Sequence, residues 1–371
     1  MKLNETMSGK NINFLIGSGA SVPFYRTLSL GDDKPSFEEL LSTDQISDCN
    51  KKILYYYYYH NVILPMESLI DDNQQFSQSQ TEVLKNYKLF IKKLLSFLKD
   101  ESNEKPKRIN VFTTNYDLMF EKCFQEILNE KTNCFFNDGS VGFINRTLNP
   151  QNFNLNICRT GYLDKYKKEV PTINLIKIHG SISWEKHDKD TIKVNYLPKI
   201  IISEIKDLND NEFSNLLSLM DKTNNSNLNA RLSELYATNK NEIDDFYEKY
   251  KSLAIINPNK WKFYETVFEQ HYYQQLRNFS YELEKENSIL IIFGFSFADE
   301  HIKEVFERVL NNPSLEVYLI CYNQKVQDDF KNIFNGGNNI EFLPNFKNNK
   351  DGTTILGNFS YLNSLFGGID G

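Results

Sequence analysis

The sequence predicts an α/β fold: a Rossmann-like, doubly wound, mainly parallel sheet that carries a helical insertion. The main observation is a series of five short β-branched or aliphatic runs, each followed by glycine or polar residues and separated by helical stretches. Such runs are typical of parallel strands buried on both faces. A chain of 371 residues can also bury a full α/β core and a second, smaller module. The expected strands are Ile12–Ile16, Ile109–Phe112, Ile173–Ile178, Ile289–Phe293 and Val317–Cys321.

Two helices are expected between the first and second strands. Pro35 precedes the run Ser36–Leu41, in which Ser36 and Glu39 have the spacing of a capping box. Further on, Glu82–Leu98 carries apolar residues at helical spacing. The sequence therefore predicts a helix over each segment.

Two later segments depart from this alternation of strands and helices. Residues 134–168 carry glycines and a proline with little periodicity, so we expect a short β excursion or a lid there. Residues 205–286 are charged and rich in asparagine, and we interpret them as a helical insertion, with helices near Glu212–Met220, Leu228–Tyr250 and Trp261–Lys285. The sequence thus predicts one domain from residues 1–204 and 287–371, and a second from residues 205–286.

Composition argues against several classes of protein. A formal net charge of −7 argues against a protein whose whole surface binds nucleic acid, although it allows a local basic patch. The five cysteines are widely spaced and never form a Cys-x-x-Cys pair, which indicates a reducing compartment and gives no zinc-ligand pattern. No signal-like core opens the chain, and no apolar run approaches the roughly 20 residues that cross a bilayer. We therefore expect a cytoplasmic protein with no membrane segment and no metal site.

A run of five tyrosines, Tyr55–Tyr59, is open to two interpretations. Exposed rings could stack on nucleic-acid bases. Consecutive residues in a helix point all around its axis, however, so five rings in a row cannot form one face. Partial burial between packed elements is therefore favoured. The aromatic surface near these residues and the helical insertion are candidate assembly interfaces.

The first strand runs directly into a loop bracketed by glycines, Gly17-Ser18-Gly19-Ala20-Ser21. The glycines allow close approach of the backbone, so successive N–H groups can converge on an anion. Such loops also occur in plain strand-to-helix turns, and the third glycine of the dehydrogenase pattern Gly-x-Gly-x-x-Gly is replaced by Val22. Alone, the loop does not decide between a phosphate site and a turn.

The second strand ends in a cluster of polar residues, Thr113-Thr114-Asn115-Tyr116-Asp117. One interpretation is a helix cap, with Thr114 or Asn115 as the N-cap and Asp117 favoured by the helix dipole. The other is a binding or catalytic site, because ligands of open α/β sheets sit at the carboxyl ends of the strands.

The three remaining strands end in the same manner. His179-Gly180 follows the third strand, and a histidine at that position is well placed for proton transfer near neutral pH. Gly294-Phe295-Ser296 follows the fourth strand, and Asn323 follows the fifth. Five strands that all end in small or hydrogen-bonding residues favour a nucleotide site over turn chemistry alone.

In this order, the motifs resemble those of the Sir2 (sirtuin) superfamily, and within it the zinc-less SIR2-like NAD hydrolases of bacterial anti-phage defence. The resemblance covers roughly residues 11–330 without the insertion. Gly17–Ser21 resembles the family's Gly-Ala-Gly-x-Ser loop, and residues 113–117 resemble its Thr-Gln-Asn-Ile-Asp. His179-Gly180 matches the catalytic His-Gly. Gly294-Phe295-Ser296 stands where the family has Gly-Thr-Ser or Gly-Tyr-Ser, and Asn323 resembles the asparagine near the adenosine.

The sequence also departs from the family pattern. Protein-deacylating sirtuins carry a zinc module of two Cys-x-x-Cys pairs after the His-Gly, and this chain has none. The family's arginine-bearing segment has two equal candidates here, Val22–Arg26 and Lys34–Phe37. The roles of Arg26 and His301 stay open.

The resemblance implies a site that cleaves NAD⁺ and needs no zinc. Asn115 would orient the ribose hydroxyls and the attacking water, Asp117 would hold the nicotinamide carboxamide, and His179 would accept a proton. The residues implied in binding the nucleotide are Gly17, Ser18, Gly19, Ala20, Ser21, Thr114, Gly294, Ser296 and Asn323. The missing zinc module favours water as the acceptor, and hence an NAD⁺ hydrolase. An NAD-dependent deacylase and a non-catalytic NAD-binding scaffold remain alternatives.

The resemblance also implies assembly, because unchecked NAD⁺ hydrolysis would harm the host cell. We expect a homo-oligomer, restrained or activated by a partner, and a HerA-type ATPase translocase is the partner to look for first. Direct nucleic-acid binding and membrane association are not expected.

Overall fold

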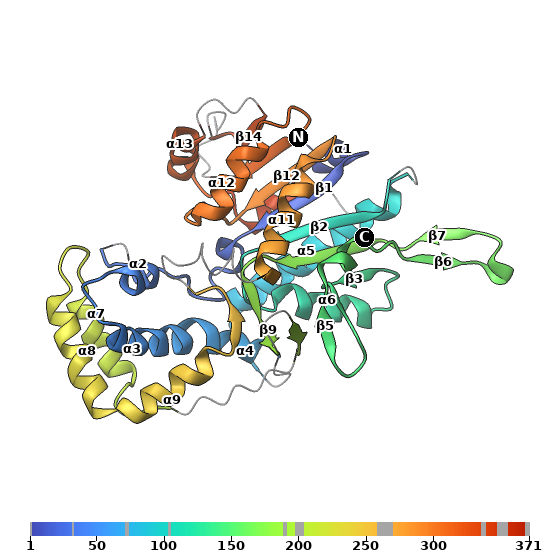
Figure 1. Ribbon diagram of the computed structural model, residues 1–371. Helices are drawn as coiled ribbons and strands as arrows, with labels where there is room; N and C mark the ends of the chain where they lie inside the picture. The colour runs from blue at the N-terminus through green and yellow to red at the C-terminus, as the bar shows by residue number, and fades with distance from the viewer. Residues whose placement is uncertain are drawn as a thin grey trace.

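A parallel sheet of seven strands forms the centre of the molecule, in the order β14-β13-β12-β1-β2-β8-β3 (Figure 1). The computed structural model describes residues 2–31, 33–70, 74–102, 105–187, 191–196, 204–257, 270–334, 339–346 and 355–367. The strands are β1 (Asn11–Ile16), β2 (Arg108–Thr113), β3 (Phe135–Asn137), β8 (Thr172–Lys177), β12 (Ser288–Phe293), β13 (Glu316–Ile320) and β14 (Ile340–Leu343). The predicted doubly wound α/β fold is confirmed.

All five predicted strands lie in this sheet, with bounds that differ from the prediction by one residue at most at either end. The two strands that the sequence did not predict, β3 and β14, form the edges of the sheet. Both are short, and most of their residues are only partly buried. They therefore lack the continuous apolar run that marks a strand covered on both faces.

Helices cover both faces of the sheet. Alternate side chains of a strand point to opposite faces, so Phe14 of β1 joins one apolar cluster and Leu15 joins the other. Phe14 packs edge-on against Phe90 of α5, with ring centroids 5.1 Å apart. On the other face, Phe112 of β2 packs against Phe279 of α11 at 4.9 Å. The helices of the first face are α5 (Gln78–Asp100), α6 (Met119–Asn129) and α14 (Phe359–Ser364), and those of the second are α11 (Gln270–Glu284), α12 (Glu300–Val309) and α13 (Gln324–Ile333).

The two helices predicted between the first strands are present. Helix α2 (Phe37–Ser42) begins with the predicted capping box, in which the Glu39 N–H donates to Ser36 Oγ and the Ser36 N–H donates to Glu39 Oε2. Helix α5 begins four residues earlier than predicted, because Ser77 forms a second capping box with Gln80.

A ladder of four buried asparagines crosses the sheet. Asn13, Asn110, Asn174 and Asn137 lie opposite one another on β1, β2, β8 and β3. The Nδ2 atom of Asn110 donates to Asn13 Oδ1 at 2.9 Å, Asn174 donates to Asn110 at 2.8 Å, and Asn137 donates to Asn174 at 2.9 Å. Because a slip of one residue would break every one of these bonds, the ladder fixes the register of four strands.

A second, antiparallel sheet lies beside the first, in the order β11-β9-β10-β5-β4. Its strands are β4 (Ser140–Val141), β5 (Arg146–Leu148), β9 (Gly180–Lys186), β10 (Ile192–Val194) and β11 (Leu253–Ile255). The strands β6 (Cys158–Thr160) and β7 (Lys167–Glu169) form a separate hairpin that stands away from the body (Figure 1). The β excursion predicted for residues 134–168 is therefore present.

A helical lobe lies to one side of the sheets (Figure 1). It combines two distant parts of the sequence, since α3 packs against α2, α8 and α9. Its helices are α2, α3 (Asp48–Tyr58), α7 (Asp210–Leu219), α8 (Ser226–Thr238) and α9 (Lys240–Tyr250). The short helices are α1 (Leu3–Met7), η1 (Ser18–Ser21), η2 (Tyr59–Ile63), α4 (Leu64–Glu67), η3 (Ser68–Ile70), η4 (Pro150–Asn154) and η5 (Tyr162–Asp164). In the described part of the chain, no helix is long and apolar enough to span a membrane.

Residues 205–286 contribute to three parts of the structure. Helix α7 occupies the first expected helical segment, whereas residues 228–250 form two helices that meet at Asn239. Strand β11 pairs with β9, and α11 covers the main sheet. Part of the third expected helix, at residues 261–269, lies outside the described residues. The division of the chain into two domains stays a prediction.

The five consecutive tyrosines are buried, each with at most 7% of its surface exposed. They lie on α3 and the turn that follows, where Tyr57 stacks on Phe213 of α7 and Tyr56 packs edge-on against Phe246 of α9. The prediction of burial between packed elements is confirmed. The suggestion of an assembly interface at Tyr55–Tyr59 is wrong, because these rings are already covered within the chain.

Candidate active site

The five predicted site loops emerge at one edge of the main sheet. Strand register aligns the last residues of the strands: Ile16 lies opposite Thr113 and Phe293, Thr113 lies opposite Lys177, and Phe293 lies opposite Ile320. The loops after β1, β2, β8, β12 and β13 therefore begin side by side, at the edge where open α/β sheets bind their ligands.

Three glycines allow the loops after β1 and β12 to touch. A Cβ on Gly17 would lie 2.4 Å from Gly294 O, and one on Gly294 would lie 2.5 Å from Ala20 N. Gly294 also has φ +67°, a conformation that favours glycine. The Gly19 N–H donates to Gly294 O at 2.9 Å, and the Ala20 N–H donates to Gly17 O at 3.1 Å. The glycines are thus needed for backbone packing, and two of the N–H groups expected to hold a diphosphate already have acceptors within the chain.

Asn115 is buried where the loops after β1 and β2 meet, with 8% of its surface exposed. Its Nδ2 atom donates to Gly17 O at 3.2 Å and to Ser21 Oγ at 3.3 Å. These two acceptors determine the orientation of the amide, because the NH₂ group and not the carbonyl oxygen must face them. Within the described part of the chain, Asn115 Oδ1 has no hydrogen-bond donor. A buried carbonyl oxygen without a donor is costly, so this atom is ready to accept a hydrogen bond from a ligand.

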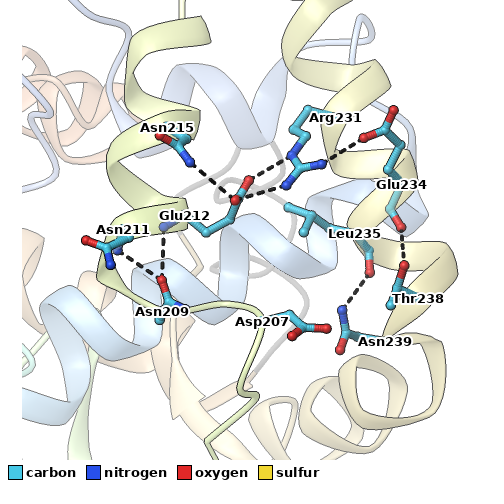
Figure 2. A pocket seen from close by; sticks show the side chains of 10 residues that line it. All are labelled: Asp207, Asn209, Asn211, Glu212, Asn215, Arg231, Glu234, Leu235, Thr238 and Asn239. Atoms are coloured by element: carbon cyan, nitrogen blue, oxygen red, sulfur yellow. Dashed lines mark hydrogen bonds and ion pairs between the residues drawn. The ribbon is translucent and has the colours of Figure 1, made fainter.

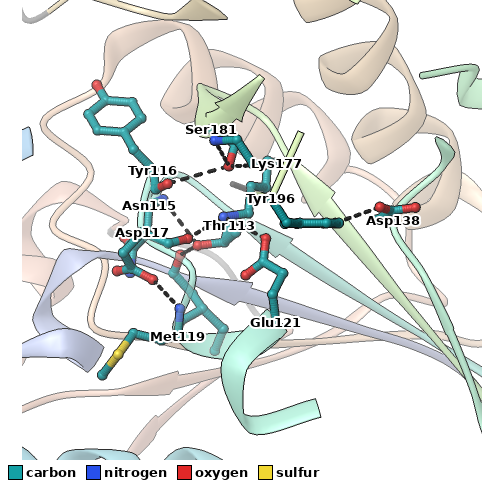
Figure 3. Close-up of polar contacts among 12 residues, drawn as sticks. Thr113, Asn115, Tyr116, Asp117, Met119, Glu121, Asp138, Lys177, Ser181 and Tyr196 are labelled. Carbon is teal, nitrogen blue, oxygen red and sulfur yellow. Dashed lines mark hydrogen bonds and ion pairs between the residues drawn. The ribbon is translucent and has the colours of Figure 1, made fainter. Parts of the chain in front are cut away.

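Asp117 lies beneath this amide and is also buried. Its Oδ2 accepts from Ser21 Oγ at 2.8 Å, and its Oδ1 accepts from the Met119 N–H at 3.1 Å (Figure 3). Tyr87 of α5 contacts Ser21 Oγ through its hydroxyl at 2.8 Å. Burial raises the pKa of the Asp117 carboxyl, and the nearby Lys177 ammonium opposes that shift. Neither Thr114 nor Asn115 is a helix cap, because α6 begins only at Met119.

A buried ion pair supports the loop after β2. Lys177 Nζ lies 3.0 Å from Glu121 Oε1 and also donates to the backbone carbonyl of Asp117 (Figure 3). Burial raises the pKa of Glu121, and Lys177 opposes this shift too. One local signal of this pair is present in the sequence, a lysine within the mainly apolar run Ile173–Ile178, whereas Tyr87 has no such signal.

His179 sits at the junction of the two sheets. Its carbonyl accepts from the Ile256 N–H at 2.9 Å, and the next residue, Gly180, opens β9 with φ +87°. A Cβ on Gly180 would lie 2.1 Å from Ala254 O. The glycine of the His-Gly motif is therefore required for β11 to approach, and this contact holds the histidine at the end of β8.

The His179 imidazole faces a second buried imidazole, that of His301 on α12. Their Nε2 atoms lie 2.9 Å apart, a hydrogen bond in which only one of the two nitrogens carries the proton. Ligand atoms of His179, His301 and Asp299 all lie within 4.8 Å of one another, close enough to hold a metal ion. Two nitrogens on a tetrahedral zinc at about 2.0–2.1 Å would be roughly 3.3 Å apart. The hydrogen bond fits the observed separation better, and the absence of zinc stays a prediction.

The other predicted site residues lie in the same row of loops. Thr114 is half-buried and donates its N–H to Ile16 O at 3.3 Å, and Ser296 is exposed on the loop after β12. Asn323 is the N-cap of α13, where its side chain accepts from the Val326 N–H. Arg26 is exposed and lies 3.5 Å from Asn61 Oδ1.

A cavity of about 430 Å³ lies in the helical lobe and contains none of the predicted site residues (Figure 2). The Arg231 guanidinium in its wall is bound by Glu212 at 2.8 Å and by Glu234 at 2.8 Å. Most of the other lining side chains are amides and carboxylates. Because a diphosphate needs free donors and positive charge, this cavity is a poor nucleotide site compared with the strand ends.

Comparison with known protein families decides the fold family. A family model described as a SIR2-like domain matches residues 109–343, more than half of the chain. The chain belongs to the SIR2-like domain family. None of the curated proteins matches it. The SIR2-like match covers Asn115, His179, Gly294, Ser296 and Asn323, and indicates an NAD-consuming enzyme.

Proposed function

We propose that this SIR2-like protein hydrolyses NAD⁺ at the bond between nicotinamide and ribose, giving nicotinamide and ADP-ribose. The observation that supports this most directly concerns the buried side-chain amide of Asn115. The amide is held in one orientation, and its Oδ1 atom accepts no hydrogen bond from the described part of the chain. A ribose hydroxyl is a donor of the right kind for that atom. The aligned loops and the SIR2-like match support the same assignment.

In the proposed reaction, the bond from C1′ to the nicotinamide nitrogen breaks, and its electron pair leaves with nicotinamide. Positive charge develops on the ribose ring, as in other glycosidic cleavages. A water oxygen forms the new bond to C1′, and its proton passes to the imidazole of His179. Asn115 orients the ribose, and the loops at Gly17–Ser21 and Gly294–Ser296 hold the diphosphate.

Asp117 acts in this proposal mainly through its neighbours. Both carboxylate oxygens already accept hydrogen bonds, from Ser21 and from the Met119 backbone. Its contacts therefore favour a role in holding the loop that carries Asn115. A direct contact with the nicotinamide carboxamide remains a prediction.

Nicotinamide release from NAD⁺ by the purified 371-residue chain tests the proposal. It is measured with and without an acetyl-lysine peptide, and with and without the expected partner, a HerA-type ATPase sought in the neighbouring gene. Release without peptide is expected. His179→Ala and Asn115→Ala should lower the rate by about 10²–10⁴-fold, whereas His187→Ala, at an exposed histidine, should not. Release only with peptide would indicate a deacylase, and binding without any turnover would indicate a scaffold; either result contradicts the proposal.

We also propose that this activity depletes NAD⁺ in bacterial anti-phage defence and is controlled by assembly with a HerA-type ATPase. This proposal is supported by the SIR2-like match and by the motif resemblance to zinc-less defence hydrolases. Expression of the chain should be toxic in a way that His179→Ala abolishes, and co-expression of the neighbouring gene should change that toxicity. Equal toxicity of both forms would refute the defence role.

A further inference from the structure

The six most exposed large hydrophobic residues in the described part of the chain all lie between residues 141 and 166. Other residues of this kind are at most 53% exposed, whereas these six are 58–105% exposed. They are Val141, Phe143, Ile144, Tyr162, Leu163 and Tyr166. Clusters of exposed apolar side chains mark interaction sites in soluble proteins.

These residues sit on two hairpins inserted between the edge strand β3 and its neighbour β8. The first, called the β4–β5 hairpin (residues 140–148), presents Phe143 and Ile144 at its tip. The second, called the arm (residues 158–169), is formed by β6 and β7 and projects from the body (Figure 1). Because each tip projects into solvent, both can reach a neighbouring molecule.

The arm is preformed, and two of its non-glycine residues, Leu163 and Asp164, have positive φ. The Asp164 N–H donates to Gly161 O at 2.9 Å and closes a turn in which Leu163 has φ +63°. Glycine or asparagine is the usual residue at this position. The Leu163 side chain is 69% exposed, so packing within the chain does not explain a leucine there. Strain of this kind collects at functional sites.

We propose that the arm and the β4–β5 hairpin are the surface through which this chain binds a second copy of itself. An aromatic side chain buries about 150–250 Å² when covered, so the three exposed rings with the three aliphatic side chains supply roughly 700–1,000 Å². A stable interface needs about 800 Å² per partner.

Charge also favours a second copy of the chain as the occupant. The chain carries a net charge of −7, whereas the arm carries four basic residues against two acidic ones. A basic, apolar arm is therefore complementary to the acidic body of another copy. Nucleic acid fits less well, because the most exposed groups are apolar and Arg146 of the β4–β5 hairpin is bound by Asp138 at 2.9 Å.

Analytical ultracentrifugation of the full-length chain tests this proposal without reference to NAD⁺. The wild type should sediment above the 43.5 kDa of one chain. The arm variant Tyr162→Ser/Leu163→Asn keeps a residue that tolerates positive φ, and the hairpin variant is Phe143→Ser/Ile144→Ser. Each should raise the dissociation constant at least tenfold, while the melting temperature measured at concentrations where both proteins are dissociated should stay the same. Lys165→Glu/Lys167→Glu should weaken association most at low salt.

The matched control is Leu128→Ser, at a residue 40% exposed on α6, which should leave association unchanged. A monomeric wild type would overturn the proposal, as would hairpin variants that assemble normally. Sedimentation of the wild-type monomer with anionic vesicles or with DNA would reassign the surface to a membrane or to nucleic acid. Nicotinamide release is measured separately, so failure here leaves the proposed hydrolase activity untouched.

Discussion

At the scale of single residues, the His179–His301 contact makes a specific prediction about rate. His301 holds in place the imidazole that is proposed to accept the proton. Misplacement of a reacting group by about 1 Å can lower the reaction rate by up to about 10²-fold. His301→Ala should therefore lower kcat for NAD⁺ hydrolysis with little change in KM. His301→Gln, whose amide oxygen can still accept from the Nε2–H of His179 and so keeps Nδ1 as the nitrogen that takes the proton, should recover part of the loss.

The matched control is the exposed His187, whose substitution by alanine should leave both constants unchanged. A loss of kcat in His301→Gln equal to that in His301→Ala would argue against the hydrogen bond as the cause. Bound zinc in the purified wild type, lost in both variants, would point instead to a metal held by His179, Asp299 and His301.

A second residue-scale prediction concerns the pH dependence of stability. Burial raises the pKa of Glu67 to about 7, partly offset by its hydrogen bond from the Tyr59 hydroxyl. The folded state therefore favours the protonated acid, and Glu67 destabilises the fold progressively as pH rises from the ordinary carboxyl range through 7. Glu67→Gln should raise the melting temperature at pH 8 more than at pH 5. Equal shifts at both pH values would contradict the assignment.

At this scale the sequence identified most residues of the proposed site, but not the buried residues that hold its loops in place. Asn115, His179 and Gly294 each follow an apolar run, which is a local pattern. Tyr87 and Glu121 act through contacts that only the fold creates, one across 66 residues of chain to Ser21 and the other beneath the loop after β2. No local pattern distinguishes such residues from ordinary helix residues.

At the scale of elements, the asparagine ladder predicts unequal costs for equivalent substitutions. Asn110→Val removes the middle of the ladder and leaves Asn13 Oδ1 and one N–H of Asn174 without partners. Each buried group left unpaired costs about 1–3 kcal/mol, so the two together should lower the free energy of unfolding by about 2–6 kcal/mol. Asn13→Val, at the end of the ladder, should cost about half as much.

Urea unfolding of the two single variants and of Asn13→Val/Asn110→Val measures these costs. The double variant should cost less than the sum of the single ones, because removing both partners leaves fewer unpaired groups. Additive costs would show that the asparagines do not interact.

Burial of the strands explains why some elements could be predicted from the sequence and others could not. Strands buried on both faces show as apolar runs, and a single asparagine does not hide them. The edge strands β3 and β14 lack such runs. The helical lobe joins residues 37–58 to residues 210–250, a tertiary pairing that periodicity along one segment cannot reveal.

At the scale of the whole molecule, bound NAD⁺ should stabilise together several loops that are far apart in the sequence. The loops after β1, β2 and β12 already contact one another, through Asn115 and Gly17 and through Gly19 and Gly294. A ligand that binds this folded site stabilises all of it at once, by about 2.7 kcal/mol at a ligand concentration 100 times Kd. Hydrogen exchange of the His179→Ala variant with NAD⁺ should therefore slow together in residues 17–21, 113–117 and 294–297.

The cavity of the helical lobe provides the internal control for that measurement. Its walls, at Asp207, Glu212 and Arg231, share no residue with the strand-end loops. Slower exchange there, with no change at the three loops, would move the nucleotide site to the lobe and remove the basis for the proposed chemistry. Protection of the three loops by ADP-ribose as well as by NAD⁺ would assign the contact to the diphosphate and adenosine half of the ligand, because ADP-ribose lacks nicotinamide. Any further slowing near residue 179 that only NAD⁺ produces would then report the nicotinamide end, where the bond is proposed to break.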